Sequence, residues 1–402
     1  MKKLFTLLSL CIILLYSCNS NSGKEEKPYP ELQTILNDVK QKYIPDWRDN
    51  IFDVKITDVN GTPVIKGSTN MPEAHQELVA LATKQNSKLL DSIKILPDTE
   101  GLNGKTYGVI NLSVANIRVA PEYSGEMATQ LLLGMPIRIL EKKDWYRIQG
   151  PEGYHSWTTY ISFHPMTKEE FNAWTVAPKI VFTDYYGFAY EKADEKSQRV
   201  SDLVACNMLK YEGDAGRFYK VTYPDGRLGY VLKSQSKPFE QWFASIELTE
   251  ESILEKAFMS MGIPYLWGGT SVKGMDCSGF TKTTFFMHGV ILKRDASQQV
   301  HTGMPVDIKS GYENLRPGDL MFFGKEAEGD KKMRIGHVGF YIGNKQFIHA
   351  AGRVKVNSLD PNAANYDEYN TSRFIRASRV IGAVGTNGIW SIQDNPLYQV
   401  QE

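Results

Sequence analysis

The feature that most constrains the fold of this chain is an internal duplication with a fixed offset of 73 residues. In both copies apolar and polar residues alternate on either side of a Pro-acid-Gly turn, which is typical of short antiparallel strands. The matching segments are 145–148 (WYRI) with 218–221 (FYKV) and 151–153 (PEG) with 224–226 (PDG). The duplication predicts two small all-β barrels, over residues 105–166 and 175–237.

The duplication also bears on the cysteines. At the same offset Cys206 matches Leu133, an alternating apolar position, so we expect Cys206 to be a small buried hydrophobe in a strand. In an exported protein the ordinary expectation is a Cys206–Cys277 disulfide. The match to leucine argues against that bridge and leaves Cys277 without an evident partner.

The start of the chain predicts export. Lys2 and Lys3 precede an apolar run over residues 4–16, which is too short for a bilayer span of about 20 residues but suits a secretory signal. The residues before Cys18 resemble the lipobox of bacterial lipoproteins. We therefore expect a signal peptide over 1–17, lipidation of Cys18, a lipid-anchored linker over 18–29, and an exported lipoprotein held on a membrane of the bacterial cell envelope. The alternative is an ordinary signal peptide followed by an accidental cysteine.

The charge balance excludes one class of partner. Lys2 and Lys3 are the only charged residues before Cys18, so the remainder carries 44 basic against 46 acidic residues, a net charge of −2. A nucleic-acid binder needs a basic face to neutralise phosphates, so no nucleic-acid partner is expected.

Residues 30–104 predict a small α+β module. Helical spacing relates Leu32, Ile35, Leu36 and Val39, and Asn60-Gly61 marks a hairpin turn between alternating stretches. A second set of leucines and isoleucines predicts another helix; it comprises Leu78, Leu81, Leu89 and Ile93. No function can be assigned to this module, and packing is its default role.

Residues 245–395 change in character. An amphipathic helix is expected over Thr249–Met261 with Thr249 as its cap, and Gly-rich loops, a second helix and several strands follow. This order of elements is the α+β pattern.

Cys277 begins the second helix of this segment, directly after Asp276. A thiol at a helix N-terminus faces unpaired amide groups and the positive end of the dipole, so its pKa is expected to fall to roughly 3.5–7.5 and yield a nucleophilic thiolate. The alternative is a buried structural cysteine.

Two histidines supply the partners that such a thiolate needs. His337 and His349 lie on consecutive predicted strands joined by a hairpin near Gly343, which places the imidazoles side by side as base and orienter. They share a face only if the hairpin has an odd-length loop or a bulge near Gly343 to Lys345, so we predict one. A Cys/His/His metal site is the rival interpretation, weakened by the lack of a fourth ligand.

At these residues the chain resembles the NlpC-type cysteine peptidases of bacterial cell-wall turnover. Asp276-Cys277-Ser278-Gly279, Gly336-His337-Val338-Gly339 and His349 match the motif of that family, and the duplicated segment resembles bacterial SH3-like domains. The subgroup most similar to the chain cuts γ-D-glutamyl-L-diamino-acid bonds (dipeptidyl-peptidase VI type). The resemblance implies a papain-like α+β catalytic domain, two all-β SH3-like barrels and a small α+β N-terminal module.

The resemblance also implies roles for residues and a substrate. Cys277 would be the nucleophile, His337 the base and acid, and His349 the orienter, with no cofactor. The substrate would be the L-Ala-γ-D-Glu-diamino acid stem peptide of peptidoglycan. The residues implied in binding it are Tyr265, Trp267, Asp276, Ser278, Asp295 and Ser297, of which Arg294-Asp295 could instead be a surface ion pair.

Glu126 and Tyr154 are added to the binding residues because the duplication is asymmetric there. Arg199 and Arg227 stand at the equivalent positions of the second copy, and a position needed only for packing would not favour an acid in one copy and arginine in the other. Drift is the alternative. Two other functions stay open for the whole chain: a non-catalytic envelope-binding lipoprotein, and an acyltransferase of the same superfamily acting on lipid.

Overall fold

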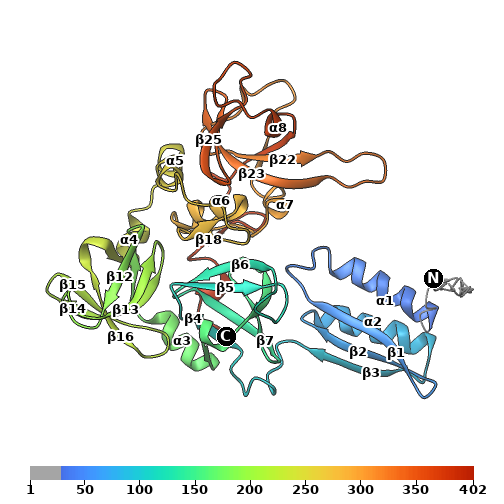
Figure 1. Ribbon diagram of the computed structural model, residues 1–402. Helices are drawn as coiled ribbons and strands as arrows, with labels where there is room; N and C mark the ends of the chain where they lie inside the picture. The colour runs from blue at the N-terminus through green and yellow to red at the C-terminus, as the bar shows by residue number, and fades with distance from the viewer. Residues whose placement is uncertain (1–28) are drawn as a thin grey trace, which may run out of the picture.

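The computed structural model describes residues 29–402 (Figure 1). The predicted signal peptide, the lipidation site Cys18 and all but the last residue of the predicted linker lie outside the described residues. Within them, no helix is both long enough and apolar enough to cross a bilayer.

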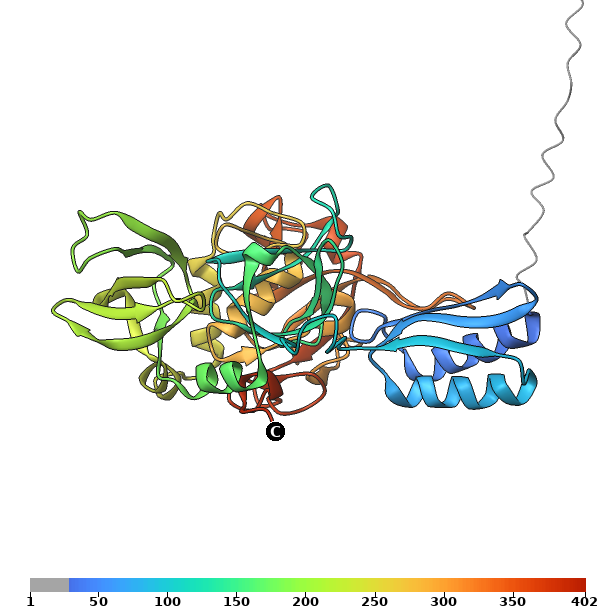
Figure 2. The ribbon, with the colours of Figure 1, turned by 90° about the horizontal axis from the view of Figure 1, so that it is seen from below.

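The N-terminal domain (residues 30–104) is a three-stranded sheet with both of its helices on one face (Figure 2). Its elements are α1 (Pro30–Tyr43), β1 (Phe52–Val59), β2 (Thr62–Thr69), α2 (Pro72–Gln85) and β3 (Leu90–Ile95). Leu32, Leu36 and Val39 are buried as predicted, and Asn60 and Gly61 form the β1–β2 turn with positive φ.

The second predicted helix of this domain was placed too far along the chain. Helix α2 ends at Gln85, and Ile93 lies in β3, which pairs in parallel with β2. The apolar spacing that continues to Ile93 belongs to a parallel strand, because the β2–α2–β3 crossover must return the chain to the sheet.

The first repeat domain (105–166) and the second repeat domain (175–237) each contain a seven-stranded sheet in which corresponding strands occupy the same order, as the duplication predicts. The first has β4 (Tyr107–Ile110), β5 (Val114–Arg118), β6 (Met127–Leu132), β7 (Pro136–Lys142), β8 (Tyr146–Gln149), β9 (His155–Thr158) and β10 (Phe163–Met166). The second has β11 (Lys179–Phe182), β12 (Tyr186–Tyr190), β13 (Arg199–Val204), β14 (Met208–Ala215), β15 (Phe218–Thr222), β16 (Leu228–Leu232) and β17 (Ser236–Pro238). Helices α3 (Lys168–Val176) and α4 (Phe239–Ala244) follow the respective sheets.

Cys206 is buried and forms no disulfide, as predicted, but it does not lie in a strand. It occupies the turn between β13 and β14 with a φ of 68°, and its counterpart Leu133 lies in the equivalent turn after β6. Its Sγ lies 3.9 Å from the carbonyl oxygen of Phe286. The prediction of a strand at Cys206 is therefore wrong, because a buried residue in the following turn continues the apolar alternation of the strand.

The C-terminal domain (residues 245–395) packs helix α6 (Cys277–Phe286) against a six-stranded sheet of order β21-β26-β22-β23-β24-β25. The strands of this sheet are β21 (Met304–Val306), β22 (Leu320–Lys325), β23 (Arg334–Gly343), β24 (Gln346–Ala351), β25 (Arg353–Ser358) and β26 (Phe374–Arg379). The remaining elements are α5 (Glu250–Met259), β18 (Thr270–Ser271), β19 (Gly274–Met275), β20 (Val290–Ile291), α7 (Ala296–Gln299), α8 (Glu368–Thr371) and β27 (Trp390–Ser391). Thr249 caps α5 as predicted.

The β23–β24 hairpin carries the predicted bulge. Phe340 pairs with Ile348, yet Gly343 pairs with Gln346, so one extra residue is inserted on β23 between Tyr341 and Gly343. This insertion places His337 and His349 on the same face of the sheet, which a regular two-residue hairpin would prevent.

Candidate active site

Asp276 fixes the start of helix α6 and with it the position of Cys277. One carboxylate oxygen of Asp276 accepts the Gly279 amide at 2.7 Å as the helix cap, and the other accepts the Gly268 amide at 2.9 Å. A Cβ on Gly279 would lie 1.9 Å from the Gly269 carbonyl oxygen, so this close approach of two glycine-rich segments excludes every larger residue.

The environment of the Cys277 thiol reverses one prediction. The backbone of Val338 and of Ser278 hydrogen-bonds to the thiol and favours the thiolate, but burial, followed by the nearby Asp276 carboxylate, raises the pKa of Cys277 to about 12. The expected lowering at a helix N-terminus is therefore wrong for the unliganded site, because desolvation of the thiolate outweighs the amides. At neutral pH this thiol is protonated, so it would need a base in order to act as a nucleophile.

A hydrogen-bonded chain of three side chains ends at His337, the residue before Val338. His337 Nε2 lies 2.7 Å from His349 Nδ1, and His349 Nε2 lies 2.9 Å from Asn357 Oδ1. The Asn357 amide nitrogen donates to the Asn365 carbonyl at 2.9 Å, which turns Oδ1 of Asn357 towards His349.

The chain sets the tautomer of each imidazole. Because Asn357 Oδ1 can only accept, His349 must carry its proton on Nε2, and its Nδ1 accepts from His337 Nε2. His337 then presents an unprotonated Nδ1. Burial, followed by repulsion from His349, lowers the pKa of His337 to about 3, so this lone pair is free at neutral pH. The sequence analysis did not identify Asn357, which lies on β25 beside His349. The available signal was a third predicted strand, on which the same alternation places a polar side chain next to the two histidines.

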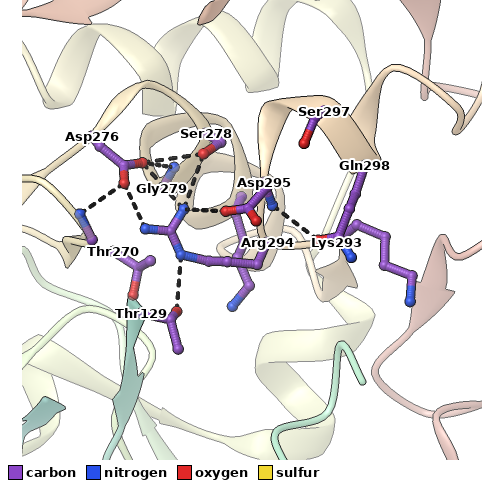
Figure 3. A network of polar contacts seen from close by, with 12 residues as sticks. Thr129, Thr270, Asp276, Ser278, Gly279, Lys293, Arg294, Asp295, Ser297 and Gln298 are labelled. Atoms are coloured by element: carbon purple, nitrogen blue, oxygen red, sulfur yellow. Dashed lines mark hydrogen bonds and ion pairs between the residues drawn. The ribbon is translucent and has the colours of Figure 1, made fainter. Parts of the chain in front are cut away.

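A buried arginine connects the two residues that flank Cys277 to the first repeat domain (Figure 3). Arg294 is 1% exposed and donates to Asp276 Oδ2 at 2.6 Å, to Ser278 Oγ at 2.9 Å and to Thr129 Oγ1 at 3.0 Å. The interpretation of Arg294-Asp295 as a surface ion pair is wrong, since Arg294 is buried and its close partner is Asp276. Both Asp276 oxygens are taken by protein donors.

The remaining predicted residues form the rim. The pKa of Tyr265 is raised by burial and then by the nearby Cys277, and that of Tyr154 by burial and then by Asp295. Trp267, which is 61% exposed, donates from Nε1 to Glu126 at 2.6 Å. Of the two residues singled out from the duplication, Glu126 contacts the C-terminal domain directly, and Tyr154 lies close enough to Asp295 to be affected by its charge.

Asp295 and Ser297 have a partner that sequence reasoning missed. Arg48 of the N-terminal domain donates to both side chains at 2.8 Å. No sequence signal marked Arg48, because its contacts span about 250 positions. Among residues 29–402 no group of three or more histidine, cysteine or acidic side chains is arranged to hold a metal ion.

Comparison with known proteins defines the class of this site. Residues 262–376 match the NlpC/P60 family and residues 117–158 match the bacterial dipeptidyl-peptidase SH3 domain. The murein DD-endopeptidase MepS/murein LD-carboxypeptidase of Escherichia coli is 32% identical over 153 residues, which cover 37% of this chain and 72% of that protein. The chain belongs to the NlpC/P60 family.

Two relatives match a longer part of this chain. The γ-D-glutamyl-L-lysine dipeptidyl-peptidase of Bacillus cereus is 29% identical over 263 residues, covering 62% of this chain and 75% of that protein. Dipeptidyl-peptidase 6 of Lysinibacillus sphaericus is 28% identical over 268 residues, covering 63% and 91% respectively. The crystal structure of an NlpC/P60 family protein from Bacillus cereus shares the fold, with a TM-score of 0.57 at 24% identity over 68% of this chain and 99% of that one.

Proposed function

We propose that this protein is a cysteine peptidase that hydrolyses the γ-D-glutamyl to diamino acid bond of peptidoglycan stem peptides. The observation that carries the proposal is the hydrogen-bonded chain from Asn357 through His349 to His337, which leaves Nδ1 of His337 unprotonated. The next residue, Val338, contacts the Cys277 thiol through its backbone. The similarity to two dipeptidyl-peptidases supports the choice of bond.

The reaction follows from this arrangement. His337 Nδ1 takes the thiol proton as Cys277 Sγ bonds to the γ-glutamyl carbonyl carbon. The carbon–nitrogen bond then breaks and the same proton passes to the leaving amine. Water, deprotonated by His337, hydrolyses the thioester and restores the thiol. His349 and Asn357 hold the imidazole and stabilise its charged form, as an orienter does in a catalytic triad.

The rim residues account for the rest of the substrate. The free α-ammonium of L-Ala meets the negative charges of Asp295 and Glu126 beside the Tyr154 phenol. Glu126 is exposed, so it acts through its charge and not as a buried carboxylate. Ser297 donates to the α-carboxylate of D-Glu, Tyr265 and Trp267 line the entrance, and Asp276 holds Ser278 beside the pocket by accepting its hydroxyl at 3.2 Å.

This arrangement favours released wall fragments over the intact wall. In intact peptidoglycan the L-Ala nitrogen is amidated to the sugar, so it carries no charge for Asp295 and would need space that Tyr154 and Trp267 occupy. The proposal also includes membrane attachment through Cys18 and a location in the cell envelope, both of which rest on the sequence alone. It further includes an SH3-like fold for the second repeat domain, which shares the strand order of the first.

The deciding experiment incubates the chain lacking residues 1–18 with the free tripeptide L-Ala-γ-D-Glu-diamino acid and with its N-acetylated form, and identifies products by mass spectrometry. We expect the dipeptide L-Ala-γ-D-Glu from the free tripeptide, at a rate at least tenfold above that from the acetylated one, because acetylation removes a charged hydrogen bond worth about 1.5–3 kcal/mol. Equal rates would remove the preference for a free amine. No cleavage of either would favour the non-catalytic wall-binding alternative or, if a lipid ester is consumed instead, the acyltransferase.

A further inference from the structure

The loop between α1 and β1 takes the N-terminal domain to the rim of the site. Asp46, Arg48 and Asp49 of this loop contact α7 and the residues just before it. Asp49 accepts from Lys293 Nζ at 2.8 Å, and Asp46 accepts from Gln298 Nε2 at 3.0 Å. A domain that served only as a spacer would not need three charged side chains at this junction.

Arg48 makes the central contact. Its Nη1 atom donates to Asp295 Oδ2 and to Ser297 Oγ, both at 2.8 Å, so one nitrogen bridges two residues of the rim. Asp46 holds the guanidinium from behind, accepting from Nη2 at 2.6 Å and from Nε at 2.8 Å. With its side chain only 18% exposed and held on both sides, Arg48 is fixed in orientation.

The first repeat domain holds the loop itself. His155 donates its backbone amide to the Arg48 carbonyl at 3.1 Å, and its Nε2 lies 2.9 Å from the Trp47 carbonyl. His155 directly follows Tyr154, so the same short segment places the phenol near Asp295 and holds the loop that carries Arg48. Two hydrogen bonds from His155 therefore hold the loop against the first repeat domain.

The bridging contact determines what Asp295 and Ser297 can offer a ligand. Ser297 Oγ accepts from Arg48, so its hydroxyl hydrogen is left to donate to a carboxylate. Asp295 Oδ2 is occupied by Arg48, and Oδ1, which lies 4.0 Å from Arg294 Nη1, keeps a lone pair that can accept from an ammonium. Without Arg48 both side chains would rotate, and Ser297 could direct its hydrogen to Asp295 instead.

We propose that Arg48 is a positioning residue of the substrate site, and that the N-terminal domain thereby completes the pocket for the L-Ala-γ-D-Glu part of the substrate. This inference rests on the proposed function for the identity of the ligand. A cavity of about 610 Å³, lined by Arg48, Ser297 and the neighbouring charged residues, lies at this junction, so water can replace a truncated side chain and the fold is expected to survive.

The test compares Arg48→Ala, Arg48→Lys and the matched control Lys42→Ala, which removes a surface ion pair with Glu77 in the same domain. On the free tripeptide we expect Arg48→Ala to raise KM about tenfold with kcat within threefold, because a charged hydrogen bond contributes roughly 1.5 kcal/mol or more to binding. Arg48→Lys should recover only part of KM, since an ammonium cannot hold both acceptors and Asp46 in one plane. Lys42→Ala should match the parent, and the melting temperature of all three should stay close to it.

A double-mutant cycle separates positioning from general destabilisation. In an Asp295→Asn background, Arg48→Ala should raise KM by less than about threefold, because the residue through which it acts is already altered. Full multiplication of the two effects, or an unchanged KM in Arg48→Ala alone, would overturn the inference.

Calorimetry tests the role of Arg48 in binding independently of whether the protein cleaves the tripeptide. The dipeptide L-Ala-γ-D-Glu is titrated into Cys277→Ala and into Cys277→Ala combined with Arg48→Ala. Tenfold weaker binding in the second protein supports the role of Arg48 even if the parent cleaves no tripeptide. Equal binding, or no binding to either protein, rejects that role even if cleavage is observed.

Discussion

The two repeat domains share one strand order but differ in their relation to the active site. The first lies between the other three units (Figure 1) and contributes Thr129 to the buried arginine, Gln130 to the backbone of Thr270, and Glu126 to Trp267. In the second, the residue equivalent to Glu126 is Arg199, which lies over the ring of Phe188 within its own domain.

The difference lies at the boundaries between the domains. Both copies keep the apolar positions that specify the sheet, such as Ile148 and Val221, because burial of these residues stabilises each domain separately. Positions at the boundaries between domains have diverged. Where the first copy has Thr129 against the buried arginine of the C-terminal domain, the second has Asp202, which forms an ion pair with Lys273 of the same domain.

The largest difference in activity is expected between substitutions of the two cysteines in the described part of the chain. Cys277→Ala should reduce hydrolysis of the tripeptide by roughly 10⁴-fold or more with little effect on folding, because alanine cannot replace the proposed nucleophile. Cys206→Ser in the second repeat domain should keep activity within a few-fold. Activity is measured by product release and folding by circular dichroism; a Cys206→Ser enzyme as inactive as Cys277→Ala would contradict the division between domains.

Substitution of the acidic residue should lower the free energy of unfolding more in the first Pro-acid-Gly turn than in the second. Glu152 of the first turn pairs with Lys282 of α6 at 3.1 Å, with side chains 1% and 6% exposed, whereas Asp225 of the second pairs with the exposed Arg227. Glu152→Ala leaves a buried lysine without its partner and should cost about 3–5 kcal/mol. Asp225→Ala should cost about 1 kcal/mol or less. Urea unfolding measures both, and equal losses would mean that the first domain is not joined to α6 through this pair.

The pH dependence of alkylation tests the revised state of the thiol. With the pKa of Cys277 raised to about 12, the thiolate fraction should grow about tenfold per pH unit, so iodoacetamide labelling should be roughly 100-fold faster at pH 9 than at pH 7. Burial raises the pKa of Cys206 to about 12 as well, and Cys206 should label only after unfolding in denaturant. A plateau between pH 6 and pH 8 would instead restore a preformed thiolate at the helix N-terminus.

The smallest expected difference concerns equivalent surface positions. Glu126→Gln should raise KM for the free tripeptide about fivefold, because an exposed charge pair is worth ~1 kcal/mol. Its counterpart Arg199→Gln should leave KM within twofold, and neither change should affect the N-acetylated tripeptide. KM values for the two substrates decide the matter; identical behaviour of the two variants would attribute the asymmetry of the duplication to drift.

Local patterns were sufficient for much of this molecule. The duplication predicted two sheets of like topology, the residues that follow Cys277 predicted the helix that begins there, and parity along two strands predicted the bulge that brings His337 and His349 together. Each of these depends on interactions between near neighbours in the chain or on strand alternation, which a sequence displays directly.

Only the tertiary structure decided the chemistry of the thiol and the outline of the rim. The pKa of Cys277 depends on how completely the surrounding chain removes water, which no local pattern encodes. Arg48 reaches Asp295 and Asn357 reaches His349 because separate elements fold against one another. A polar side chain carries no sign of its partner until that packing sets the distance.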